Sequence, residues 1–164
     1  MNALDTLWAA RAKERRYKNM AQREISERRM ERLKAAFGWT EEQIRNLSPR
    51  QWKYLENSRK FAQYQIVAEV VKAENCYYHP QIGDKFVFSA GGELLPNECT
   101  FPALCVFALA PIFVPYIYLI QDRICEGVDP CGLVLDHIKC LDAGVEGGGF
   151  GEVLFRIYCE EAAP

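Results

Sequence analysis

The pattern of hydrophobic and polar residues differs between the first and second parts of the chain. Residues 5–36 are rich in Arg, Lys, Glu and Ala, contain no proline and carry only a thin apolar stripe. Asp5 is a suitable N-cap, and Gly38 follows the last turn, where a helix end favours glycine. This pattern predicts one long helix over residues 5–36. It buries little of its own surface, as expected of a solvated arm or of a strut against another subunit.

Two shorter helices are predicted by repeated capping signals. Thr40 with Gln43, and Ser48 with Gln51, have the spacing of capping boxes. Pro49 suits the first helical position. We therefore expect helices over about 41–46 and about 49–60. Each box is flanked by an apolar pair of the hydrophobic-staple type: Trp39 with Ile44, and Leu47 with Trp52.

The second part of the chain is richer in β-branched residues and in short alternating runs. These runs predict strands over 65–73, 85–89, 133–141 and 152–159, with the loop 144–151 joining the last two as a hairpin. Thr100–Ile120 contains 21 residues and no charge, which is long enough to span a bilayer. Prolines at 102, 111 and 115 interrupt this segment. We expect two short buried helices that break near Pro111, the second ending around Gly127, and no membrane span.

This order of elements predicts an α+β fold. An N-terminal long helix and two short helices precede a small antiparallel sheet of about four strands, which packs with two apolar helices. The predicted domains are a helical arm, residues 1–62, and an α+β cysteine-containing domain, residues 63–164.

The net charge also differs in sign between the first and second parts of the chain. Residues 1–75 hold 16 Lys and Arg against 10 Asp and Glu, a net of +6, whereas residues 76–164 hold 4 against 12, a net of −8. Glutamates interleave with the basic residues of the predicted arm, as in a self-paired helix. We therefore expect residues 5–36 to bind a protein partner or another copy of the chain, and expect no nucleic acid.

All seven cysteines and both histidines lie in the acidic part. An odd number of cysteines, in a chain that opens without a basic segment and a long apolar run, favours reduced thiols in the cytoplasm. Four of the cysteines have apolar or helix-end surroundings and are expected to pack: Cys105, Cys125, Cys131 and Cys159.

The remaining cysteines have spacings that suit a metal site for zinc or iron. Cys76 and His79 have the Cys-x2-His spacing of a metal knuckle, and His137 and Cys140 have the reverse spacing. Residues three apart on a regular strand face opposite ways, so the second pair needs a bulge or a strand end between its members. Cys99, in a polar loop, is a candidate for the remaining ligand position. The alternative for each pair is a packed cysteine beside an ordinary histidine.

Two further features bear on ligand binding. The glycine cluster at 147–151 lacks the following helix and Lys of a phosphate loop, which favours a hairpin turn or a close backbone approach. Aromatic residues near the predicted metal ligands are candidates for lining a pocket for an aromatic or planar small molecule: Tyr77, Tyr78, Phe101 and Phe150.

A set of residues in the C-terminal part forms a recognisable pattern: Cys76, His79, the run 82–86, Cys99, and the runs 102–104, 140–142 and 153–155. In this pattern the chain resembles a widespread family of small, cysteine-containing bacterial and archaeal proteins that have no assigned activity. The likeness covers about residues 66–160 and leaves out the helical arm. It implies a compact cytosolic α+β domain, often from anaerobes, and supports special roles for Cys76, His79 and Cys99.

Three functions fit these features. The leading prediction is a metal-binding accessory or small subunit of a larger enzyme complex of anaerobic metabolism. The first alternative is a small metal- or thiolate-dependent enzyme that acts on an aromatic or planar small molecule. The second is a protein-interaction module without a metal, whose cysteines only pack.

Overall fold

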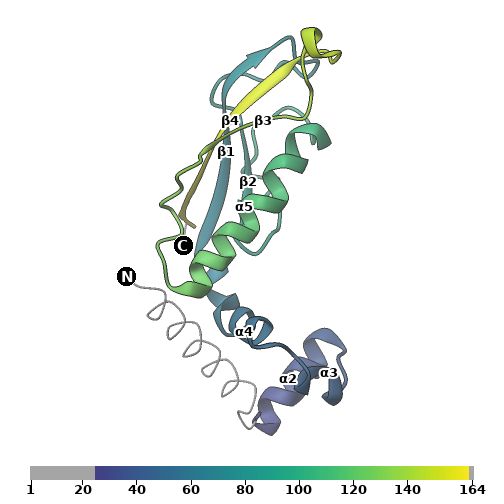
Figure 1. The fold of residues 1–164 in the computed structure, drawn as a ribbon, viewed down its shortest axis with the longest axis vertical. Helices are drawn as coiled ribbons and strands as arrows, with labels where there is room; N and C mark the ends of the chain where they lie inside the picture. Colours follow the sequence, from purple (N-terminus) through teal and green to yellow (C-terminus); the bar gives the residue numbers. More distant parts are fainter. Residues whose placement is uncertain (1–24, 163–164) are drawn as a thin grey trace, which may run out of the picture. The chain divides into compact units, whose positions relative to one another are not determined.

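A computed structural model of the chain describes residues 25–162 (Figure 1). Two compact units divide after Glu56. The first is helical, and the second holds the sheet and one long helix. Mixed helix and sheet confirms the coarse prediction of fold class. Residues 5–24 of the predicted long helix lie outside the described part of the chain.

The single long helix predicted over 5–36 is not confirmed. Helix α2 runs over Glu27–Phe37, and residues 25 and 26 precede it in a non-helical conformation. Ser26 is its N-cap, because the Ser26 side chain accepts a hydrogen bond from the Arg29 backbone N–H. Gly38 ends it in the left-handed region, at φ 67°, and donates to Lys34 O. The sequence identified this C-terminus and missed the cap at Ser26.

Both short helices are confirmed, as α3 over Glu41–Arg45 and α4 over Pro49–Phe61. Thr40 and Gln43 make both hydrogen bonds of a capping box. The Ser48 N–H donates to Gln51 Oε1 at 2.8 Å, and the Gln51 N–H donates back to Ser48 Oγ at 3.3 Å. The staple residues belong to one small core built around the buried side chains of Met30, Ile44 and Trp52.

The second unit contains a four-stranded antiparallel sheet in the order β2-β1-β4-β3. Its strands are β1 (Tyr64–Glu74), β2 (Lys85–Ser89), β3 (His137–Lys139) and β4 (Glu152–Glu161). The predicted third strand, over 133–141, is shortened to three residues. Residues 133–135 lie outside the sheet, and their side chains border a pocket beside a helix.

The core lies between one face of the sheet and helix α5, which runs along the sheet (Figure 1). Alternate residues of each strand face this core, as the two-residue period of a strand requires. Those of β1 are Ile66, Ala68 and Val70, those of β2 are Phe86 and Phe88, and those of β4 are Val153, Phe155, Ile157 and Cys159.

Helix α5 spans Val106–Glu126 without a break, so the prediction of two helices separated near Pro111 is wrong. A proline inside a helix leaves the carbonyl four residues earlier without its intrahelical donor. For Pro111 that carbonyl belongs to Phe107, and the Leu141 N–H donates to it at 2.8 Å. The replacement bond from outside the helix allows α5 to continue until Gly127, which ends it at φ 70° as expected.

Candidate functional site

The turn after β1 brings Cys76 and His79 together along the backbone. The His79 N–H donates to Cys76 O at 3.0 Å. Asn75 and His79 both have left-handed backbone conformations, at φ 53° and 48°, which few residues other than glycine adopt. The Cys76 side chain packs partly against the core, and His79 is exposed. The tight turn that the metal prediction requires is therefore present.

Cys99 covers the outer edge of β2. Its sulfur accepts a hydrogen bond from the Val87 N–H at 3.3 Å and lies 3.3 Å from Leu95 O. It is half-buried against the core. Cys105, and not Cys99, is the residue at the N-cap of α5. The Cys99 thiol is thus placed to satisfy the backbone of an edge strand.

His137 and Cys140 lie on opposite faces of the β3 segment. His137 is exposed, and its Nδ1 is 2.7 Å from Asp136 Oδ1, a hydrogen bond that lowers the pKa of the Asp136 carboxyl. Cys140 packs against the core, where its sulfur accepts a hydrogen bond from the Val153 N–H at 3.3 Å. No bulge separates them, because Ile138 keeps regular pairing with Phe155. The structure therefore does not bring this pair onto one ion.

Within residues 25–162, no three His, Cys, Asp or Glu side chains form a group arranged to hold a metal ion. All seven cysteines are free thiols. Burial raises the pKa of the Cys159 thiol, and a hydrogen bond with Cys131 adds to this effect. The five proposed ligands are thus distributed over three places in the second unit, and the zinc or iron site remains a prediction from the sequence.

The four aromatic residues that were expected to line a pocket do not share one environment. Phe101 belongs to the core, where its ring stacks on Phe86 with 4.5 Å between centroids. Tyr77 and Phe150 are 84% and 81% exposed. Tyr78 is exposed as well, and meets Tyr77 edge-on with 5.4 Å between centroids. These residues do not line the pocket that we describe below.

The glycine-rich loop between β3 and β4 wraps around the carboxylate of Asp142. The backbone N–H groups of Phe150, Gly144 and Gly151 donate to this carboxylate at 2.9, 3.1 and 3.3 Å, and they lower the pKa of Asp142. A Cβ at position 149 would lie 1.9 Å from Asp142 Oδ1, so glycine is required there. The loop therefore makes a close backbone approach around an anion that the chain itself supplies.

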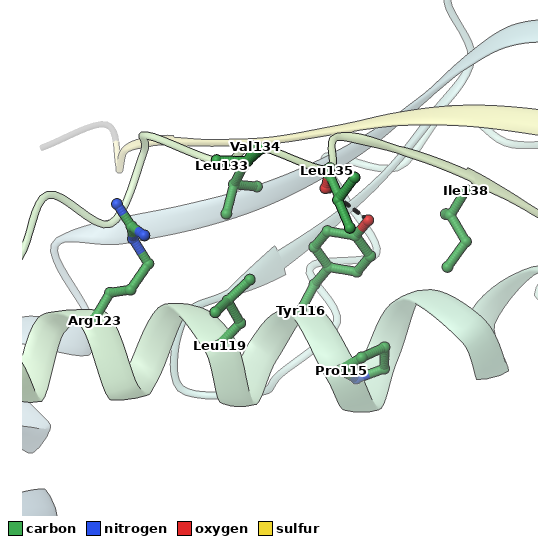
Figure 2. Close-up of a pocket in the computed structure, with 8 residues that line it drawn as sticks. All are labelled: Pro115, Tyr116, Leu119, Arg123, Leu133, Val134, Leu135 and Ile138. Carbon is green, nitrogen blue, oxygen red and sulfur yellow. Dashed lines mark hydrogen bonds between the residues drawn. The ribbon is translucent and has the colours of Figure 1, made fainter.

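A pocket that the sequence did not indicate lies between α5 and the segment that leads into β3 (Figure 2). Its volume is about 470 Å³. Its walls are apolar apart from the guanidinium of Arg123 and the hydroxyl of Tyr116. One signal was available: Arg123 is the only Lys or Arg between residues 86 and 138. The lining residues are Pro115, Tyr116, Leu119, Arg123, Leu133, Val134, Leu135 and Ile138.

The side of α5 that faces away from the core is also apolar. Phe107, Val114 and Tyr118 are 58%, 54% and 65% exposed, and their spacing of seven and then four residues places them on one stripe. We call these three residues the outward stripe. Of the described helices, α5 alone is long and apolar enough to cross a bilayer by length and composition. It is not a clear membrane span, because its other side forms part of the core.

Searches of protein-family models, curated proteins and solved structures found no match to this chain. The resemblance to small cysteine-containing proteins therefore stays a prediction based on the residues that carry it.

Proposed function

We propose that the protein is a small subunit that docks onto a partner protein through the outward stripe of α5. The observation that carries this proposal is the exposure of Phe107, Val114 and Tyr118 on a helix whose opposite side is buried. A helix on the surface of a monomeric domain normally presents polar residues to water. A contiguous exposed apolar surface instead marks a site of association.

Charge distinguishes among the surfaces that would cover this stripe. The sequence from residue 76 onwards has a net charge of −8, so two copies that met through α5 would bring two acidic regions together. The same charge opposes the anionic surface of a membrane, which attracts helices with Lys and Arg on their polar side. The occupant that we propose is a different protein that offers an apolar groove with a basic rim, and contact with the basic residues 1–75 of another copy is an outcome that the test below distinguishes.

A photo-crosslinking experiment tests this docking surface. A photoreactive residue replaces Tyr118 in the full chain, and a matched variant carries it at Arg59, an exposed position on α4. We expect position 118, and not position 59, to crosslink one protein in stoichiometric yield. The complex should re-form from the two purified proteins and be lost with Tyr118→Lys. Crosslinks between copies of this chain, flotation with lipid vesicles, or equal yields at both positions would contradict the proposal.

The metal site predicted from the sequence is a second candidate function. The observation that favours it is the tight turn that joins Cys76 and His79. If this turn holds zinc or iron, protein purified without oxygen should contain stoichiometric metal that is lost with Cys76→Ser and retained with Cys125→Ser. Protein that contains no stoichiometric metal would exclude this candidate and leave the docking proposal unaffected.

A further inference from the structure

The pocket beside α5 has the size and lining of a site for a small organic molecule. Its volume of about 470 Å³ falls within the range of known ligand pockets, roughly 300–1,000 Å³. Two of its lining residues, Val134 and Leu135, are 92% and 79% exposed. An apolar ligand that covered these side chains would remove them from water, which favours binding.

One permanent positive charge lies at the end of this pocket. Arg123 Nε donates to Asp129 O at 2.7 Å, which uses one of the five N–H groups of the guanidinium. A carboxylate lies close to one edge of this guanidinium, since a Cβ added to Gly132 would be 3.0 Å from Asp129 Oδ2 and 3.3 Å from Arg123 Nη2. Figure 2 shows Arg123 at one end of the pocket, with apolar side chains of both walls beyond it. A ligand in the pocket would meet the guanidinium from the side of the apolar walls.

The other polar side chain of the pocket, Tyr116, already makes a hydrogen bond within the protein. The Tyr116 hydroxyl donates to Leu135 O at 2.9 Å, the contact that is dashed in Figure 2. Burial raises the pKa of this hydroxyl, and the nearby charge of Asp136 acts in the same direction, so Tyr116 stays neutral. Among the eight lining residues, Arg123 carries the only charge.

From these features we propose that the pocket binds an amphipathic monocarboxylate, in which an apolar chain or ring carries one carboxylate. The planar guanidinium of Arg123 matches a carboxylate in a two-pronged hydrogen bond, and the apolar walls cover the rest of the ligand. A phosphate monoester fits less well, because its second negative charge has no second cation in the pocket and faces an acidic domain. This inference goes beyond the docking proposal and does not depend on it.

Calorimetric titration of the purified full chain tests the ligand class without any substitution. The probes are octanoate, 1-octanol and octyl phosphate, together with shorter carboxylates. We expect octanoate to bind about tenfold or more tightly than 1-octanol, as charge-assisted hydrogen bonds imply. Each added methylene should tighten binding about fourfold until the pocket is full. Equal binding of octanoate and 1-octanol, tighter binding of octyl phosphate, or no saturable binding would overturn the proposal.

Two variants then locate the carboxylate. Arg123→Gln should remove the advantage of octanoate over 1-octanol while leaving the binding of 1-octanol unchanged. Arg32→Gln makes the same change of charge on an exposed side chain of α2 and should have no effect. An octanoate advantage that survived in folded Arg123→Gln would place the anion elsewhere and overturn the proposal. If that variant does not fold, the comparison of octanoate with 1-octanol on the unmodified chain decides.

Discussion

The two sides of helix α5 carry similar residues in opposite surroundings. On the inner side, Ile112 and Ile120 are 1% and 0% exposed and pack against the sheet. On the outward stripe, Val114 and Tyr118 are more than half exposed. Hydropathy does not distinguish these two sides, because both are apolar. The inner side is apolar because it folds the domain, whereas folding does not account for the outward stripe, which we propose binds a partner.

The largest expected effect tests the inner side. Ile120→Ala removes buried methyl and methylene groups and leaves a cavity, so it should lower the free energy of unfolding by about 2–5 kcal/mol. Urea denaturation followed by circular dichroism measures this change. The matched control is Val114→Ala on the outward stripe, which should change the free energy by about 0.5 kcal/mol or less. Equal losses in both variants would contradict the distinction between the two sides.

A smaller effect is expected at Tyr116, which lies on the inner side in one row with Ile112 and Ile120. Tyr116 is buried, yet its hydroxyl reaches the backbone of Leu135 on the facing segment. Tyr116→Phe removes this hydrogen bond and should lower the free energy of unfolding by about 1 kcal/mol. Tyr118→Phe removes a hydroxyl from the outward stripe and is the matched control. A neutral Tyr116→Phe variant would show that the contact does not hold the facing segment in place.

A still smaller effect on stability is expected from a charge on the outward stripe. Tyr118→Lys places an ammonium where the side chain is already 65% exposed, so the free energy of unfolding should change by about 0.5 kcal/mol or less. The same substitution should abolish binding to the proposed partner. Unfolding of this variant in the absence of a partner would show that the stripe serves the fold.

The last prediction concerns Asp142, in the loop that follows the contact between Leu141 and α5, and it is tested through the pH dependence of stability. The pKa of Asp142 is lowered in the folded chain, so the carboxylate stabilises the fold above its unfolded pKa, and this contribution is lost as pH falls through the folded pKa. The melting temperature should therefore fall less between about pH 6 and pH 3 in Asp142→Asn than in the unmodified chain. Parallel pH dependences would contradict this role of Asp142.

Much of the fold was predictable from local signals. The capping boxes at Thr40 and Ser48 gave both short helices, and the β-branched runs gave the positions of all four strands. The errors arose where a distant contact overrides a local rule. Pro111 does not break α5, and the Phe107 carbonyl that it leaves without an intrahelical donor accepts a hydrogen bond from Leu141, 34 positions after Phe107 in the chain. Residues 133–135 have strand propensity but lie outside the sheet and border the pocket beside α5, and propensity alone does not show whether a strand partner is present.

The candidate site was less predictable, because spacing along the chain does not show which way a side chain points. The two-residue period correctly indicated that His137 and Cys140 would face opposite ways on a regular strand. Phe101 was expected near a ligand and instead stacks in the core. The pocket around Arg123 depends on a contact between α5 and the 133–138 segment. In the sequence its only sign was an isolated arginine in an apolar region.

The cover over β2 has a consequence for assembly. Along the outer edge of β2, the backbone groups of Lys85, Val87 and Ser89 already have hydrogen-bond partners. Thr100 and Phe101 bond to Lys85, Cys99 and Leu95 bond to Val87, and Glu93 bonds to Ser89. Another chain therefore finds no free backbone groups to pair with along β2, and β3 at the opposite edge of the sheet has only three residues. Strand addition, the usual route to fibrils and to domain-swapped sheets, is blocked along β2. Association along this flank must then rely on side-chain surfaces, and mutations that loosen residues 93–101 should expose a template for aggregation.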